Sequence, residues 1–464
     1  MRESTVAVAL LALMPCLPAE ARAQQRQTCE LVYAGTTNTF NQNSPNQMDF
    51  LGGGVRLRCD RGTTIVADSA VRTVLNNRLE FIGDVHYQDT TRTLTSSYLQ
   101  YLGSERLIVA STDVVLTDIA TGSTMTGPFL SYYLKSDSRQ EEILQMPQGR
   151  PRATLIRQPR SDTVQAAADT LRRDTTIVDA NLIEVIGETR FVGRGNVEIT
   201  RGMTKGYGGE VEYLEETGLL TLKEDARLVS EEYTLAGDTV IAEGMEGDEF
   251  REILSRGEAS LVSEDMNIAG RAVRIFLEQG EVQRLVALGD TVEGGVRATA
   301  LSAEFEMEAD SIDALAPAQV LETVVAVGAA FGERITPDSL AEDRPELIRN
   351  DWVRGDTIIA HFTDAPPPTE PSDTTGPERV LERLDAIAGT RTPASSLYRM
   401  QDQQSEEGRP AVNYLVARRI IVMMEEGEVT TVEAEEAVHG MYLRAPVSNT
   451  AGEPARDTGG RERR

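Results

Sequence analysis

The strongest constraint on the fold is a two-residue alternation of apolar and polar side chains in residues 191–222, FVGRGNVEITRGMTKGYGGEVEYLEETGLLTL. Val197 and Ile199, for example, flank Glu198. The segment also contains seven glycines, and each glycine in a helix interior costs about 1 kcal/mol relative to alanine. A helix is therefore excluded, and the pattern predicts short β-strands joined by tight turns.

A three-residue phrase recurs along the chain. It consists of a small or polar residue, then Asp, Asn or Glu, then the opening residue of a predicted strand. The copies are Gly83-Asp84-Val85, Thr112-Asp113-Val114, Gly195-Asn196-Val197, Glu224-Asp225-Ala226, Gly257-Glu258-Ala259 and Gly289-Asp290-Thr291. The first two copies are 29 residues apart, and the four copies from Gly195 onward follow one another at intervals of 29 to 33 residues. Repeats of this length stack into elongated architectures, so an elongated, all-β fold is predicted.

Two polar interruptions divide the predicted array. Residues 136–174 are charged and lack alternation, which predicts a surface linker. Residues 364–410 begin with DAPPPTEPSDTTGPER, a tract that cannot bury a core and is predicted to be a disordered insertion. The expected segments are 1–23 signal peptide, 24–135 first β module, 136–174 linker, 175–363 second β module, 364–410 insertion, 411–445 C-terminal strands and 446–464 disordered tail.

The N-terminal residues have the features of a secretory signal peptide. An apolar run from Val6 to Leu17 precedes Ala21-Arg22-Ala23, which has the small-x-small form of a cleavage site. The run is shorter than the roughly 20 residues that span a membrane. We expect cleavage after residue 23; an uncleaved anchor is the alternative, because Glu3 offsets the charge of Arg2.

Two cysteines, Cys29 and Cys59, remain after cleavage. An even pair in a chain that enters an oxidising compartment predicts a disulfide, with two free thiols as the alternative.

The formal net charge is −28, from 46 basic and 74 acidic residues. This balance argues against nucleic acid as a partner and against docking on an anionic membrane surface. It is typical of a protein that keeps long exposed strands soluble.

The sequence offers no catalytic constellation. His86, His361 and His439 lie in different blocks and have no metal-ligand spacing, so we expect no metal and no cofactor. A nucleophile elbow and a phosphate loop are both absent from the sequence. Acidic residues lie mainly at outward positions, where a solvated surface is the favoured interpretation. An enzyme acting on envelope polysaccharide is therefore the remotest of the alternatives.

The inward positions form a continuous apolar face. Aromatic residues are 5% of the chain and Trp352 is its one tryptophan, which disfavours a sugar-binding surface. If the folded-over sheet stays open, this face is a trough suited to methylene chains, each methylene contributing about 0.8 kcal/mol on burial. A filled sandwich core is equally compatible with the pattern.

Three segments resemble the organic-solvent-tolerance (OstA-like) family, which includes the periplasmic bridge protein LptA and the N-terminal domain of the translocon LptD. The recurring phrase of the family is a Gly-Asn/Asp-Val strand, followed by a strand that ends in an aromatic residue and then by an apolar strand. The segments are FIGDVHYQDTTRTLTSSYLQYLGSERLIVASTDVVLTD (81–118), VDANLIEVIGETRFVGRGNVEITRGMTKGYGGEVEYLEETGLLTL (178–222) and GEVTTVEAEEAVHGMYL (427–443). The resemblance covers most of residues 50–363 and 411–443.

The resemblance implies a β-jellyroll, or folded-over β-taco, of repeated antiparallel strands. It implies a non-enzymatic periplasmic bridge, associated with the outer membrane, whose groove shields acyl chains of lipopolysaccharide or a similar glycolipid. Other jellyroll proteins, joined through edge strands, and an outer-membrane translocon are the implied partners. An envelope scaffold that binds partners but no lipid is the alternative. By position, the groove residues are Leu99, Tyr101, Val197, Ile199, Val211, Tyr213, Leu220, Leu222, Val273, Ile275, Leu277 and Phe305.

Overall fold

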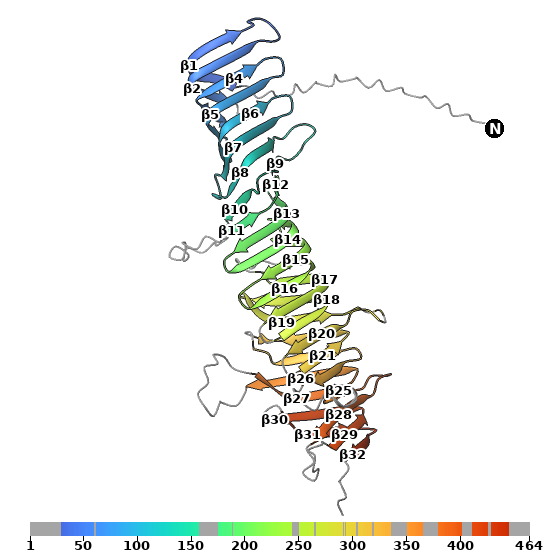
Figure 1. Cartoon of the computed structure of the whole chain (residues 1–464). Helices are drawn as coiled ribbons and strands as arrows, with labels where there is room; N and C mark the ends of the chain where they lie inside the picture. Colours follow the sequence, from blue (N-terminus) through green and yellow to red (C-terminus); the bar gives the residue numbers. More distant parts are fainter. Residues whose placement is uncertain are drawn as a thin grey trace, which may run out of the picture.

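The chain forms an elongated stack of antiparallel strands in the computed structural model (Figure 1). The structure describes residues 29–59, 62–156, 175–187, 189–243, 250–263, 266–290, 292, 294–302, 305–317, 320–335, 350–364, 379–400, 411–425 and 428–444. The expected signal peptide and tail lie outside these residues. The all-β fold class predicted from the sequence is confirmed. Among the described residues, no helix is long and apolar enough to cross a membrane.

The first third of the stack consists mainly of strands of 10 to 12 residues. Its strands are β1 (Cys29–Phe40), β2 (Met48–Cys59), β3 (Thr64–Ala67), β4 (Ser69–Thr73), β5 (Arg78–Gln88), β6 (Arg92–Leu102), β7 (Leu107–Asp118), β8 (Thr124–Tyr133), β9 (Ile143–Met146) and β10 (Arg152–Ile156). Each pairs antiparallel with its neighbours, for example β5 with β6 and β6 with β7.

The middle of the stack repeats this arrangement. Its strands are β11 (Thr175–Asp179), β12 (Leu182–Ile186), β13 (Arg190–Arg201), β14 (Thr204–Leu214), β15 (Leu219–Val229), β16 (Tyr233–Glu243), β17 (Glu252–Ser263) and β18 (Met266–Glu278). The alternating segment at 191–222 forms β13, β14 and the start of β15, as its period predicts.

The last part is built from shorter strands that divide into two ladders. Its strands are β19 (Glu281–Leu288), β20 (Ala298–Ser302), β21 (Phe305–Ala309), β22 (Ser311–Leu315), β23 (Thr323–Val327), β24 (Phe331–Arg334), β25 (Trp352–Arg354), β26 (Thr357–Asp364), β27 (Arg379–Ile387), β28 (Ala394–Met400), β29 (Ala411–Ala417), β30 (Arg419–Glu425), β31 (Glu428–Glu435) and β32 (His439–Leu443). One ladder ends in β27, β30 and β31, and the other in β28, β29 and β32.

The recurring sequence phrase marks the corners at which long strands fold over. In five of its six copies the first two residues both have positive φ, such as 77° for Gly83 and 39° for Asp84. The strand register shifts at the same places, for example between Ile82 and Val85. Each of these five phrases is therefore a β-bulge that bends the strand and re-aims its side chains. The sixth copy differs, because Gly289 and Asp290 follow the end of β19.

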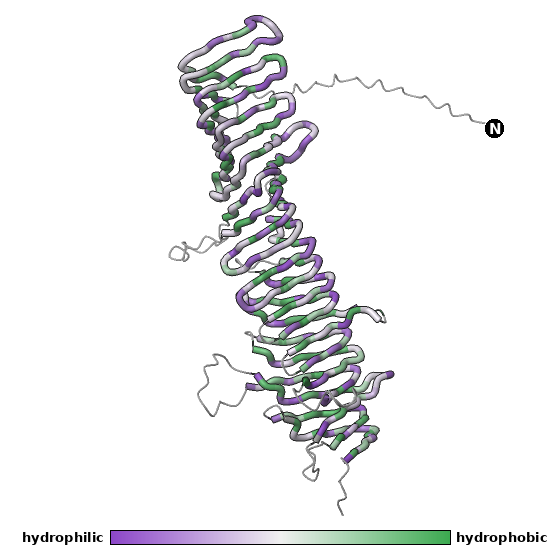
Figure 2. Tube along the Cα trace, viewed as in Figure 1, coloured by the Kyte–Doolittle hydropathy of each residue, from purple (hydrophilic) through white to green (hydrophobic). Residues whose placement is uncertain are grey.

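One continuous apolar core runs between the folded-over halves of the stack. It extends from Val55 in β2 to Val422 in β30 and includes residues of both ladders, such as Met307 in β21 and Ile312 in β22. Figure 2 shows the accompanying alternation of hydrophobic and hydrophilic residues along the strands. The alternation of the sequence therefore places one set of side chains inside and the other outside.

The two predicted interruptions contain strands, so these expectations are wrong in part. β9 and β10 lie within 136–174, and β27 and β28 lie within 364–410. Short strands carry too few residues to reveal alternation, and they form because neighbouring strands supply their hydrogen-bonding partners. β9 pairs with β8 and with β12, so the sheet continues across the expected linker. Residues 157–174, 365–378 and 401–410 lie outside the described residues.

The predicted disulfide between Cys29 and Cys59 is confirmed. The two residues are direct partners in the β1–β2 register, at the end of the hairpin opposite its turn. The bond therefore fastens the first strand of the stack to the second.

Candidate functional site

A large cleft opens along one side of the N-terminal part of the stack. Its volume is about 2930 Å³, and its lining residues come mainly from β1 to β8 and the turns between them. The cleft therefore lies where the two folded-over halves of the sheet are separated at their edge.

Two rows of turns form the rims of this cleft. The first rim consists of residues 74–77, 103–106 and 134–139, and the second of residues 89–92 and 118–121. Backbone hydrogen bonds join the successive turns of the first rim, from Gly103 N to Asn77 O at 3.1 Å and from Leu134 N to Arg106 O at 2.9 Å. Ile119 N donates to Thr91 O in the second rim at 2.9 Å. The rims are thus parts of the ladders.

The floor of the cleft is apolar. Leu51, Leu57, Leu79 and Tyr101 point inward from β2, β5 and β6 and belong to the lining. Leu51, Leu79 and Tyr101 are only half-buried and pack against the continuous core. Burial raises the pKa of Tyr101, so this phenol is neutral at physiological pH. Methylene groups placed here would contact apolar side chains of the floor in place of water.

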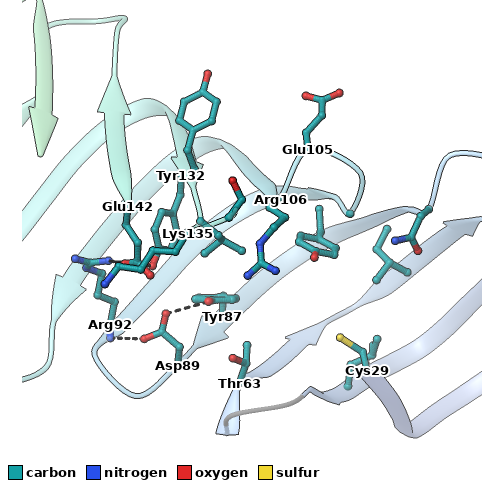
Figure 3. A pocket seen from close by; sticks show the side chains of 18 of the residues that line it. Cys29, Thr63, Tyr87, Asp89, Arg92, Glu105, Arg106, Tyr132, Lys135 and Glu142 are labelled. Atoms are coloured by element: carbon teal, nitrogen blue, oxygen red, sulfur yellow. Dashed lines mark hydrogen bonds and ion pairs between the residues drawn. The ribbon is translucent and has the colours of Figure 1, made fainter. Parts of the chain in front are cut away.

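A buried polar network lies at the inner end of the cleft, next to β9. Arg92 is 7% exposed, and its Nη1 donates to Tyr132 Oη at 2.9 Å and to Glu142 Oε2 at 2.8 Å. Tyr87 Oη donates to Asp89 Oδ2 at 2.9 Å beside it (Figure 3). Burial disfavours the charge of Arg92, but Tyr132 and the Glu142 carboxylate outweigh it and raise the pKa of Arg92. The paired charges of Arg92 and Glu142 therefore border the apolar floor at this end of the cleft.

The residues predicted to line a groove divide into two groups. Tyr101 lines the cleft, and Leu99 is fully buried beneath it in the same strand. The other ten point inward in the later part of the stack. Val197, Ile199, Val211, Leu222, Val273 and Ile275 are buried in the core, and Tyr213, Leu220, Leu277 and Phe305 are half-buried against it. Their role in lipid binding stays a prediction.

Sequence reasoning missed most residues of the cleft. Arg92, Arg106 and Glu142 lie in or beside turns, and alternation assigns no inward direction to turn residues. The structure adds what the sequence could not show: Arg106 occupies a turn position with a φ of 52°, where Gly or Asn is favoured.

Comparisons with known proteins bear on this part of the chain. The profile of the family described as "OstA-like protein" matches residues 26–137. The comparison with curated proteins finds no match. Among solved structures, the chain is similar to LptH from Pseudomonas aeruginosa, described as the LptA homologous periplasmic component of the conserved lipopolysaccharide transport device. The identity is 16%, the match covers 27% of this chain and 82% of that one, and the TM-score is 0.23. This structural likeness is too weak to support an inference.

The matched residues 26–137 include nearly all of the cleft. The resemblance first inferred from the phrases of the sequence is thus confirmed for the part of the chain that contains the site. Residues 26–137 therefore match the model of the OstA-like protein family.

Proposed function

We propose that this protein is a periplasmic carrier that shields acyl chains of lipopolysaccharide, or of a similar envelope glycolipid, in the N-terminal cleft. The observation that supports the proposal is an open cleft of about 2930 Å³ with an apolar floor, located within the OstA-like segment. Each methylene moved from water to such a floor contributes about 0.8 kcal/mol, so a few acyl chains suffice for stable binding. The role is one of binding and transport, without a catalytic step.

The proposed partners follow from the two ends of the stack. β1 pairs only with β2 in the described sheet, and β31 and β32 likewise each have a single partner strand. These strands carry exposed apolar side chains, including Tyr33 and Phe40 at one end and Met441 and Leu443 at the other. We propose that other jellyroll proteins of a transport bridge, and an outer-membrane translocon, pair with these edges.

A second candidate is an envelope scaffold that joins partners without carrying lipid. The filled interior of the later strands favours it, because Val211, Val273 and Ile275 are at most 1% exposed. Under this alternative the edge strands hold partners and the N-terminal cleft has no acyl ligand.

Site-specific photo-crosslinking distinguishes the two candidates. A photoreactive residue replaces Leu79 or Tyr101, which point into the cleft, or the outward neighbours Glu80 or Gln100 in the same strands. After irradiation in cells, mass spectrometry of the purified protein should find lipid adducts at positions 79 and 101 and none at 80 and 100. Equal labelling at all four positions, or none at any, would contradict acyl-chain binding in the cleft and favour the scaffold.

A further inference from the structure

Arg106, on the first rim of the cleft, has no side-chain hydrogen bond or ion pair among the residues that the structure describes. Its side chain lines the cleft, and Figure 3 shows it reaching inward beside Tyr87. Its Nε is buried without a hydrogen-bond partner, and among the described residues its guanidinium forms no ion pair. A guanidinium carries five donors and stays charged in proteins. The Nε donor is therefore left unsatisfied, and the rest of the guanidinium faces a cleft in which a ligand can contact it.

The backbone at Arg106 makes the choice of residue informative. Arg106 ends the turn between β6 and β7 with a φ of 52°, a region that costs a residue with a Cβ about 1–2 kcal/mol. The equivalent last residues of other turns in the stack are Asn77, with a φ of 49°, and Gly218, with a φ of 67°. Turn geometry therefore favours Gly or Asn at this position, so it does not itself account for the arginine.

Neighbouring charges leave this guanidinium available. Glu105, the adjacent acidic residue, also lines the cleft, but its carboxylate points away from the guanidinium of Arg106 in Figure 3. The next turn of the rim carries Lys135, an exposed cation that also lines the cleft. It follows Leu134, whose backbone N donates to Arg106 O at 2.9 Å. The first rim thus carries Arg106 and Lys135 on hydrogen-bonded neighbouring turns, together with Arg139, which donates to Leu134 O, and the acidic Asp137.

We propose that Arg106, assisted by Lys135, binds a phosphate group on the head of an acylated ligand whose chains lie on the floor of the cleft. Arginine forms charge-assisted, bidentate hydrogen bonds to phosphate oxygens, and the apolar floor beside it accepts the chains. The inference rests on the proposed function and specifies the ligand: an anionic, phosphorylated lipid rather than a neutral one. Arg92 cannot take this role without giving up its contacts with Glu142 and Tyr132.

The test compares two probes with one acyl chain and different heads. The first is a lysophosphatidic acid with a fluorescent acyl chain, and the second is the monoacylglycerol with the same chain. For the full-length wild-type protein we expect the phosphorylated probe to bind about 10-fold to 100-fold more tightly, which corresponds to one charge-assisted interaction in a partly buried site. The preference should shrink as salt is raised, because added ions screen the contact.

The variant Arg106→Gly removes the guanidinium and suits the turn. We expect it to bind both probes with the affinity of the wild type for the neutral probe, and to unfold at an unchanged or higher temperature. Asn77→Gly is the matched control, because it changes the equivalent residue of the neighbouring turn without altering charge. It should retain the preference for phosphate.

The outcomes separate this inference from the proposed function. If neither probe binds the wild type, both the proposed function and the phosphate inference are refuted. If both probes bind it equally and Arg106→Gly changes neither affinity, acyl-chain binding stands and the phosphate site is refuted.

Inorganic phosphate, compared with chloride at equal ionic strength, tests the source of the anion. A thermal unfolding midpoint raised by phosphate alone in the wild type, but not in Arg106→Gly, would indicate a free-anion site and overturn the lipid assignment.

Discussion

At the scale of single residues, the interior of the stack has two environments. Tyr101 is half-buried at the edge of an open cleft, whereas Ile275 in β18 is fully buried in the core. Both were assigned to one groove from their inward positions, because alternation reports the face of a strand and not the distance between facing strands. The depth of each position came only from the structure.

A charge introduced at these two positions should therefore have opposite effects. Ile275→Glu would bury an unpaired carboxylate and should cost several kcal/mol in the free energy of unfolding. Tyr101→Glu can reach water through the cleft and should leave the protein folded while acyl probes no longer bind. Urea unfolding and probe binding measure the two effects. Arg274→Gln, at the outward neighbour of Ile275, is the control and should change stability by less than about 1 kcal/mol. A folded Ile275→Glu protein would show that this part of the interior is open.

Asp385 on β27 should make stability depend on pH. It is 2% exposed, and burial alone would raise its pKa, but hydrogen bonds from Arg383 and Arg419 hold the pKa below its usual value. A lowered pKa in the folded state means that the carboxylate stabilises the protein above about pH 4, and that this contribution is lost as the pH falls further.

We therefore expect Asp385→Asn to lower the free energy of unfolding at pH 7, with the difference from wild type shrinking towards pH 3. Denaturant unfolding at several pH values provides the measurement. Asp364→Asn breaks an exposed pair with Arg379 and should have little effect at either pH. A difference at Asp385 that stays constant with pH would mean that its charge does not contribute.

At the scale of strands and turns, the corners were the best-predicted feature. The phrase beginning with Gly83, and four of its five other copies, could be located from the sequence because bulges need residues that tolerate positive φ. β27 could not be predicted, because RVLERLDAI does not alternate and becomes a strand only between β26 and β30. The rims of the cleft were also beyond prediction, since they combine turns far apart in the sequence.

The bulge at Gly257 should be intolerant of a side chain. Its φ is 75°, and a Cβ there would lie 2.8 Å from the Cβ of Asp238 in the neighbouring strand. Gly202 is the matched control, because its φ is also positive, at 56°, and a Cβ there would meet nothing within 4 Å. We expect Gly202→Ala to lower the unfolding free energy by about 1 kcal/mol and Gly257→Ala by clearly more. Equal losses in thermal unfolding would show that backbone conformation alone matters at the corner.

At the scale of the whole molecule, both ends of the stack present an edge strand. If these edges pair between copies or with bridge partners, the purified protein should form linear assemblies that lengthen with concentration. The variants Tyr33→Lys in β1 and Met441→Lys in β32 should suppress these assemblies, because a charged edge strand resists pairing. Light scattering after size-exclusion chromatography measures the distribution of masses. Lysine at Met203, an exposed residue in the β13–β14 turn, is the control. An unchanged mass distribution in both edge variants would exclude these strands as the contact.

The ladder that begins at β1 and ends at β31 passes from strand to strand without a break. Neighbouring strands are about 4.8 Å apart, so every added hairpin extends the molecule by roughly 10 Å. The length of the stack is therefore set by the number of its hairpins. Duplication or deletion of one hairpin in a gene would lengthen or shorten such a chain while the remaining hairpins kept their contacts; under the proposed bridge function, this would match the chain to a wider or narrower gap between membranes.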